Sequence, residues 1–303
     1  MNWLVFHLIS GDAFFTGIVL LMIAAFASLR ALPIFRRITA LTFLLGLVAF
    51  VLSTTAIPYW CYVVAALATL AWIVSNAAKC FPKKWHRWTT LAFVAVWLLA
   101  ALVELPYHVM PTLSPVSSRS IAVIGDSVTA GIDADETSET WPRRLAREHD
   151  VAVQDISRMG ETAASALKHA RTHTISAPIV VVEIGGNDLL GPTTTEQFAQ
   201  DLDALLTHLA TPDRQIVLFE LPLPPFRHEY GRVQRLVAQR HNVQLIPPPN
   251  LPLRDRRQYR DTRQHPPLSL RTSTDGRHRL ADCEAGISFA AYTVRSPRFE
   301  VAL

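Results

Sequence analysis

The chain has 303 residues, half of them hydrophobic, and a formal net charge of +4 at pH 7. Residues 1–112 hold the long apolar runs and carry a net charge of +5 from seven basic and two acidic side chains, which leaves the rest of the chain near neutral at −1. This distribution argues against nucleic-acid binding, which needs a basic face on the folded domain, and three cysteines are too few for a disulfide framework.

Four apolar stretches fill the first third of the chain. Each has about the 17–25 residues that a helix needs to cross the hydrocarbon core of a bilayer, and none carries a charge at its centre. We therefore predict a membrane region over residues 1–107 that contains four transmembrane helices. They span about residues 13–29, 38–57, 59–78 and 88–107.

The start of the first helix is open to two interpretations. Residues 3–10 are also apolar, and Gly11 and Asp12 interrupt the run. Asp12 is either the N-cap of a helix that begins there, or part of a helix that begins near Trp3 and draws the acid into the membrane interface. We favour the capping interpretation, because an acid within the membrane would instead indicate a functional site.

Basic residues predict the orientation of the membrane region. Residues 30–37 contain three Arg, and residues 79–87 contain three Lys and one Arg, whereas the N-terminus and residues 54–60 contain none. Because loops rich in Lys and Arg stay in the cytoplasm, both basic loops are predicted to be cytoplasmic. The chain is thus expected to be a multi-pass protein of the cell membrane, with everything after residue 107 on the extracytoplasmic side.

Residues 108–118 are rich in Pro and Ser and are predicted to be a linker to a soluble domain over residues 119–303. In that domain strand-like apolar runs alternate with helical patterns. This alternation predicts an α/β fold, a three-layer sandwich with a parallel sheet of about five strands covered on both faces. The strands are expected at 120–125, 151–155, 178–185, 215–221 and 243–246, and the helices at 141–149, 161–173, 196–210, 229–241 and 281–293.

Polar or glycine-rich turns follow three of the predicted strands. Ligand sites in parallel sheets lie at the carboxyl ends of the strands. Ser127 follows the first strand, Gly160 opens the helix after the second strand, and Asn187 lies on a glycine-rich turn after the third. These residues are therefore expected at one edge of the sheet.

A serine nucleophile also needs a base, and the chain offers one near its C-terminus. The imidazole of His278 can take the proton of Ser127, and Asp275, three residues earlier, can orient that imidazole. The oxyanion that forms on the substrate needs preorganised donors. The backbone N–H groups of Ser127 and Gly160 and the side-chain amide of Asn187 are candidates.

Together these residues resemble the SGNH, or GDSL, hydrolase superfamily, and most closely its thioesterase I and lysophospholipase L1 group. The resemblance covers about residues 119–295 and implies a flavodoxin-like sandwich, Ser127 as the nucleophile, Gly160 and Asn187 as the rest of the oxyanion hole, and Asp275 and His278 as the rest of the triad. The residues Gly125, Asp126, Gly185 and Asp188 support the motifs. The matching segments are IGDSVTAG (124–131), TWPRRLARE (140–148), SRMGETAASAL (157–167), VVVEIGGND (180–188) and DGRH (275–278).

Two features depart from the family pattern. Arg279 and Leu280 follow the histidine, where the family often has Pro-Asn. The segment 247–274 is long and rich in Pro and Arg, and its Arg-rich part, 254–263, is either a solvated loop or a surface that attracts anionic head groups or acidic glycans. These departures bear on the substrate more than on catalysis.

The sequence therefore predicts a membrane-anchored serine esterase or lipase that hydrolyses an acyl ester, such as a lysophospholipid, a thioester or a small acyl ester. An alternative is an O-acyltransferase or deacetylase that acts on envelope glycans, and a second alternative is a non-catalytic module on a hydrolase fold. We find no phosphate loop, no metal-ligand cluster and no nucleotide fingerprint in the sequence, so no cofactor, metal or nucleic-acid partner is expected. The expected partners are the substrate and the bilayer.

Overall fold

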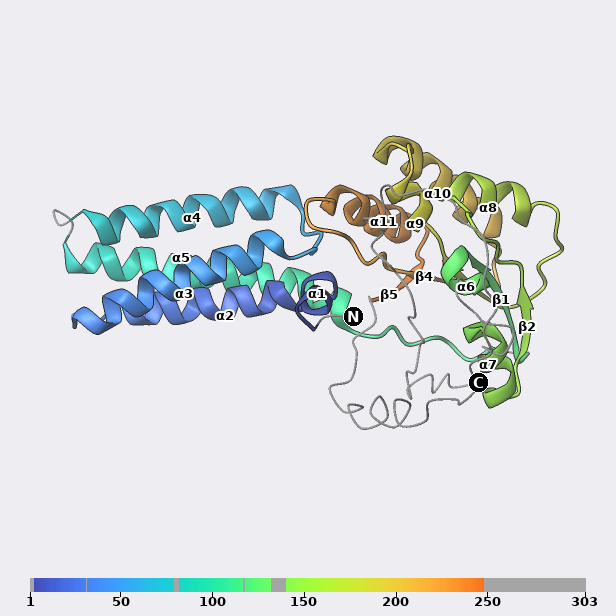
Figure 1. The fold of residues 1–303 in the computed structure, drawn as a ribbon, viewed down its shortest axis with the longest axis horizontal. Helices are drawn as coiled ribbons and strands as arrows, with labels where there is room; N and C mark the ends of the chain where they lie inside the picture. The colour runs from blue at the N-terminus through green and yellow to red at the C-terminus, as the bar shows by residue number, and fades with distance from the viewer. Residues whose placement is uncertain (1–2, 31, 79–81, 117, 132–139, 248–303) are drawn as a thin grey trace, which may run out of the picture.

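The computed structural model describes residues 3–30, 32–78, 82–116, 118–131 and 140–247. A long helical bundle adjoins an α/β domain (Figure 1). Several predictions lie outside the described residues. They are the helix over 281–293, the Arg-rich segment 254–263 and the predicted triad residues Asp275 and His278.

The bundle contains three helices that are long and apolar enough to cross a membrane, among the residues that the structure describes. Between 6% and 28% of each span is buried inside the protein, so most of its apolar surface faces outward. A fourth apolar helix, α2, is shorter, with 17 residues. The elements of the bundle are α1 (Trp3–Ile9), α2 (Asp12–Ser28), α3 (Pro33–Leu52), α4 (Tyr59–Ala77), α5 (Lys83–Glu104) and the 3-10 helix η1 (Leu105–His108).

Several helix boundaries in the bundle differ from the sequence prediction. The helix α5 begins at Lys83 instead of residue 88, and α3 ends at Leu52 instead of residue 57. The helix α2 does begin at Asp12, but its N-cap is Gly11, whose φ of 82° is left-handed, so the prediction of Asp12 as the cap was wrong. Residues 3–9 form the separate helix α1. The helix α3 begins at Pro33, five residues before the predicted start, because proline is well suited to the first turn of a helix.

The helices α2 and α3 approach each other at two glycines. A Cβ atom added to Gly17 would lie 2.9 Å from the carbonyl oxygen of Gly46, and one added to Gly46 would lie 2.9 Å from the carbonyl oxygen of Gly17. Small residues permit close helix packing in membranes, where water does not drive association. This contact therefore requires glycine on both helices.

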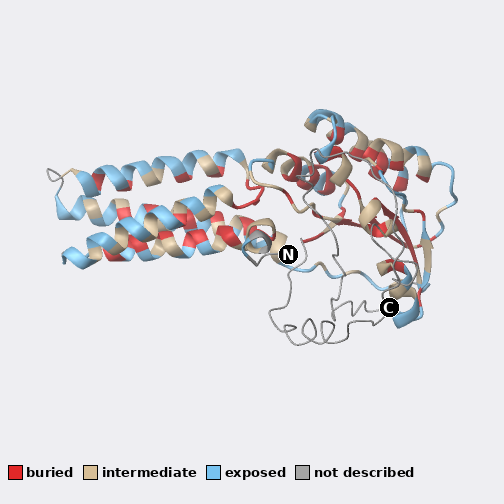
Figure 2. Ribbon diagram, viewed as in Figure 1, coloured by how far each residue is buried: buried red, intermediate tan, exposed pale blue. Residues whose placement is uncertain are grey.

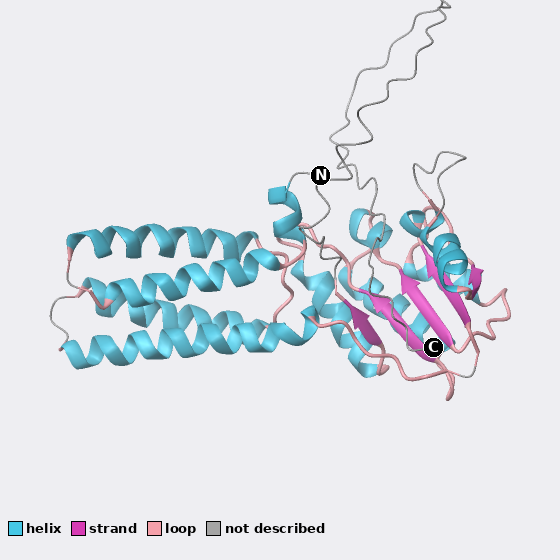
Figure 3. Cartoon of the chain, turned by 90° about the horizontal axis from the view of Figure 1, so that it is seen from below, coloured by secondary structure: helices cyan, strands magenta, loops and turns pink. Residues whose placement is uncertain are grey.

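The α/β domain contains a five-stranded parallel sheet in the order β2-β1-β3-β4-β5, which confirms the predicted parallel sheet. This order is one of the two common doubly wound arrangements. Figure 3 shows the strands side by side. The strands are β1 (Ser120–Gly125), β2 (Ala152–Asp155), β3 (Ile179–Glu183), β4 (Gln215–Phe219) and β5 (Gln244–Ile246), and the helices are α6 (Ser127–Ala130), α7 (Trp141–His149), α8 (Ala163–Ala170), α9 (Gly186–Leu190), α10 (Thr195–Leu209) and α11 (His228–Arg240).

Alternate strand residues build two separate cores, one on each face of the sheet. Figure 2 shows the buried residues of the strands in red. The side chains of Ala122, Val180 and Leu218 belong to the core beneath α8, α10 and α11. Their neighbours Val123 and Val181 face the other way, toward Leu145 of α7 and the segment around Leu113. The sheet is thus buried on both faces, as continuous apolar strands indicate.

The segment between the bundle and the first strand lies along the sheet. The side chains of Leu113 and Val116 pack against the second core. The backbone N–H of Ser114 donates to Oε1 of Gln215 at 2.7 Å, and the Gln215 amide donates back to the Ser114 carbonyl at 2.8 Å. The predicted linker is therefore fastened to the domain over residues 113–116.

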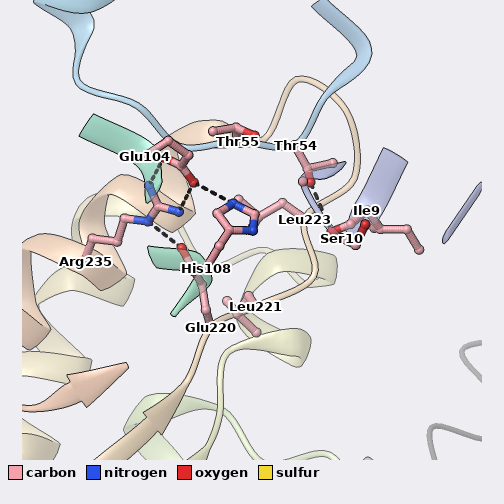
Figure 4. A pocket seen from close by; sticks show the side chains of 11 residues that line it. Ile9, Ser10, Thr54, Thr55, Glu104, His108, Glu220, Leu221, Leu223 and Arg235 are labelled. Carbon is pink, nitrogen blue, oxygen red and sulfur yellow. Dashed lines mark hydrogen bonds and ion pairs between the residues drawn. The ribbon is translucent and has the colours of Figure 1, made fainter. Parts of the chain in front are cut away.

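A buried ion-pair cluster joins the bundle to the α/β domain (Figure 4). Arg235 of α11 donates two hydrogen bonds of 2.7 Å to the carboxylate of Glu104 on α5, and its Nε donates to Glu220 at 2.5 Å. His108 Nε2 lies 3.3 Å from Glu104, and the guanidinium lies 3.8 Å from the ring centre of Tyr107. We call Glu104, His108, Glu220 and Arg235 the junction cluster.

Candidate active site at the carboxyl edge of the sheet

Ser127 is the first residue of α6, directly after β1. The Asp126 side chain caps this short helix by accepting a 2.9 Å hydrogen bond from the backbone N–H of Val128. The Asp126 backbone N–H donates to the carbonyl of Glu183 on β3 at 3.1 Å. The serine is half-buried and lies at the carboxyl edge of the sheet, where the sequence placed it.

Two glycines allow the turn after β1 to pack closely. A Cβ atom on Gly125 would lie 2.3 Å from Oγ1 of Thr129, because the Thr129 side chain fills that space. A Cβ atom on Gly186 would lie 2.9 Å from Oδ2 of Asp126. The turn that carries Ser127 therefore contacts the turn that carries Asn187.

The loop after β2 is hydrogen-bonded to the same two turns. The side-chain amide of Asn187 donates to the carbonyl of Glu161 at 2.9 Å, which leaves its second hydrogen for another acceptor. Asp188, fully buried, accepts from the backbone N–H of Ala163 at 2.9 Å. The backbone N–H of Arg158 donates to the Gly125 carbonyl at 3.1 Å. The structure thus brings the loops of Ser127, Gly160 and Asn187 to one edge.

Gly160 does not open a helix, contrary to the sequence prediction. The helix α8 begins at Ala163, and Thr162 caps it in a reciprocal capping box with Ser165. Such a box satisfies the first N–H groups of the helix and so fixes its start. Gly160 lies two residues before the cap with a φ of +75°, and no atom lies within 4 Å of the position that its Cβ would take. The side-chain position of Gly160 therefore opens to free space.

The acids of this edge are unusually costly to ionise. Burial raises the pKa of Asp126, although the Val128 N–H opposes the change and the nearby Asp188 adds to it. Burial likewise raises the pKa of Asp188. The two carboxylates repel each other in an environment of low dielectric, so their hydrogen bonds to backbone N–H groups are needed to hold them there.

Sequence reasoning missed the functional potential of Glu183. This residue ends β3, and its Oε2 accepts hydrogen bonds from Thr129 Oγ1 and, at 3.2 Å, from Trp141 Nε1. Burial and the neighbouring Asp126 raise the pKa of Glu183 to about 7, although these two donors oppose the change. The available signal was a single acid at the end of an otherwise apolar strand.

Known proteins resemble this chain over the α/β domain. The sequence matches the GDSL-like lipase/acylhydrolase family over residues 123–270. Esterase TesA of Pseudomonas aeruginosa is 30% identical over 145 residues, which are 43% of this chain and 71% of that protein. Among solved structures, a crystal structure of TesA is 31% identical, with 42% of this chain and 77% of that chain covered and a TM-score of 0.38. The SGNH-hydrolase family esterase AlinE4 is 25% identical, with coverages of 55% and 89% and a TM-score of 0.40.

Proposed function

The chain belongs to the GDSL-like lipase/acylhydrolase family and is a serine hydrolase that acts on esters, and we propose that it is a membrane-anchored esterase with Ser127 as its nucleophile. The observation that carries this assignment is the meeting of three loops. Ser127, Gly160 and Asn187 lie on turns that are hydrogen-bonded or in contact at the carboxyl edge of one sheet. Acyl transfer needs a nucleophile and oxyanion donors on one side of the same carbonyl.

The proposed reaction has two steps. The Ser127 hydroxyl attacks the ester carbonyl carbon while His278 takes its proton, and the proton passes to the departing alcohol or thiol as the carbon–oxygen or carbon–sulfur bond breaks. Water then attacks the acyl-enzyme, His278 takes one of its protons and returns it to Ser127, and the carboxylic acid leaves. Asp275 orients the imidazole. The backbone N–H groups of Ser127 and Gly160 and the second amide hydrogen of Asn187 receive the oxyanion.

Two exposed apolar side chains support an apolar acyl group as part of the substrate. Met159, next to Gly160, is 69% exposed, and Leu190, at the end of the helix that carries Asn187, is 68% exposed. Contiguous exposed apolar surface is typical of sites that bind apolar ligands, and we propose that Met159 and Leu190 belong to one such surface. A fatty acyl ester therefore fits these surroundings better than an acetyl ester of a glycan.

The arrangement of the bundle supports the anchoring and its direction. The carboxyl ends of α2 and α4 and the amino ends of α3 and α5 lie at the end of the bundle far from the α/β domain (Figure 1). The amino ends of α3 and α5 carry basic residues, such as Arg36 and Lys83. If basic ends stay in the cytoplasm, the hydrolase domain lies on the extracytoplasmic side. The bundle then crosses the membrane by four helices, with α2 as the shortest.

The assignment is tested with the full chain in detergent. We expect a fluorophosphonate probe to label the protein, and p-nitrophenyl esters to be hydrolysed, with both signals lost in Ser127→Ala. Ser120→Ala is the matched control, because Ser120 begins the same strand and its hydroxyl bonds only to the hydroxyl of the exposed Ser118 among the described residues. Labelling that persists in Ser127→Ala would contradict the assignment of Ser127 as the nucleophile. Acyl esters of an added polyol among the products would favour the transferase alternative.

A further inference from the structure

Glu183 joins three elements of the active site through one carboxylate oxygen. It ends β3, opposite Gly125 of β1 in the sheet register. Its Oε2 accepts from Thr129 of α6 and from Trp141, the first residue of α7, and Trp141 Nε1 also lies 3.3 Å from Thr129 Oγ1. Thr129 is fully buried. The contacts form a closed triangle beneath the turn that carries Ser127.

The helix α6 needs such support because it has four residues. A single helical turn is unstable on its own, since the entropy cost of its nucleus is not repaid by further hydrogen bonds. The Asp126 side chain fixes the start of this turn by accepting from the backbone N–H of Val128. Thr129, two residues after Ser127, fixes the other end by packing over Gly125 and donating to Glu183.

The strand that Glu183 ends also leads to Asn187, which we propose as an oxyanion donor. Asn187 lies four residues after Glu183, in the short helix α9 that follows the same strand. Movement of α6 relative to β3 would therefore change the separation of the nucleophile from the Asn187 amide. The carboxylate of Glu183 holds these two parts in one arrangement.

We propose that Glu183 is a positioning residue for ester hydrolysis, which fixes the helix of Ser127 against the strand that leads to Asn187. This inference rests on the proposed function. Its neighbours distinguish it from a structural ion pair, because no cation of the described residues contributes to its surroundings and its hydrogen-bond partners are neutral. Because Oε2 accepts both bonds, the amide oxygen of glutamine can replace it.

The test compares two substitutions of Glu183 in the full chain. Glu183→Ala removes the acceptor, and we expect kcat for a p-nitrophenyl ester to fall by about 10- to 100-fold, the scale of a misplacement of about 1 Å. KM should change less than about threefold, because substrate binding does not use this contact. Glu183→Gln should restore most of kcat. Asp203→Asn, an acid-to-amide change on α10 that faces Arg240 and His241, is the control and should keep wild-type kcat.

A second variant guards against a general loss of folding. Thr129→Val keeps the shape of the side chain and removes the donor, and we expect a fall in kcat without a lower yield of folded protein. The double variant Thr129→Val/Glu183→Ala should be no slower than Glu183→Ala alone, because both act through one contact. Unchanged kcat in Glu183→Ala, equal loss in Gln and Ala, or additive losses would overturn the inference. A wild-type chain that hydrolyses no ester would instead refute the proposed function.

Discussion

Glu183 is the last residue of β3 and Glu220 directly follows the neighbouring strand β4, yet their surroundings differ. Glu220 is 5% exposed and shares the guanidinium of Arg235 with Glu104, which is 1% exposed. Glu183 has neutral donors, the hydroxyl of Thr129 and the indole of Trp141, within the described part of the chain. At one edge of the sheet, Glu220 is thus paired with a cation, whereas the neighbouring Glu183 is hydrogen-bonded to neutral groups among the described residues.

Because of this difference, Glu220 has a structural role in an ion pair, whereas Glu183 can change its protonation state. Burial lowers the pKa of Arg235, but the hydrogen bonds and charges of Glu104 and Glu220 outweigh this and raise it, so the guanidinium stays charged. Burial raises the pKa of Glu183 to about 7 because no cation offsets it. The guanidinium of the junction cluster is therefore charged at all ordinary pH values, whereas the pKa of Glu183 lies near neutral pH.

The largest effect is expected from removal of the shared cation. Arg235→Met leaves Glu220 buried without its hydrogen-bonded cation and leaves Glu104 with only His108 beside it, which costs about 3–5 kcal/mol. Thermal unfolding of the full chain in detergent should show a large drop in Tm. The triple variant Arg235→Met/Glu104→Gln/Glu220→Gln removes all three charges and should recover much of that loss. Equal Tm values for the single and triple variants would show that the cost arises from lost packing.

Much of the α/β domain could be predicted from the sequence because its signals are local. The bounds of α7 match the prediction of 141–149, since Thr140 and Pro142 mark a helix start. Apolar runs likewise indicated all five strands. The helix α9 was missed because its five residues are too few for a periodic pattern.

Local sequence signals could not predict contacts between residues that lie far apart in the chain. Glu183 and Thr129 are 54 residues apart, and Glu104 and Arg235 are 131 residues apart. The pattern of residues 88–107 did not indicate that Glu104 would pair with Arg235 of the hydrolase domain. Motifs did predict the strand ends that carry Ser127 and Asn187. The partners of Ser127 near the C-terminus, Asp275 and His278, stay predictions.

The second prediction concerns the pH dependence of stability. Because the pKa of Glu183 rises from 4.5 in the unfolded chain to about 7 in the folded chain, the folded state binds more protons between these values. The free energy of unfolding should therefore fall as the pH rises from 4.5 to 7, by about 3 kcal/mol in all for this group. Below pH 4.5 this contribution is complete, and above pH 7 it is lost.

The measurement compares wild type and Glu183→Gln by thermal unfolding at pH 5 and pH 8. The wild type should lose more stability between the two pH values than the variant does. Asp126 and Asp188 shift in the same direction, so the variant should retain part of the dependence. Identical pH profiles would mean that Glu183 does not titrate in this range.

A smaller effect is expected from Glu104→Gln. This change removes one of the two acids of the junction cluster and leaves Arg235 paired with Glu220. The loss of a charged, two-bonded contact costs about 1.5–3 kcal/mol. Limited proteolysis should cut the segment around residues 109–112 faster than in wild type, because the domain is then held less firmly. A wild-type cleavage rate together with a wild-type Tm would contradict a coupling role for Glu104.

The smallest effect is expected from an exposed ion pair that otherwise resembles the junction contact. Arg240 donates to Asp203 at 2.7 Å, the same distance that joins Arg235 to Glu104. The Arg240 side chain is 59% exposed, however, whereas the Arg235 side chain is 9% exposed. Water solvates both partners of the exposed pair after it breaks, so Arg240→Ala should cost at most about 1 kcal/mol. Arg235 is more buried and also bonds to two acids, whereas the printed bond of Arg240 goes to Asp203 alone, so Arg235→Met should lower Tm far more than Arg240→Ala. Comparable Tm shifts for the two variants would mean that water reaches the junction cluster. The contrast between the paired Glu220 and the unpaired Glu183 would then be unsupported.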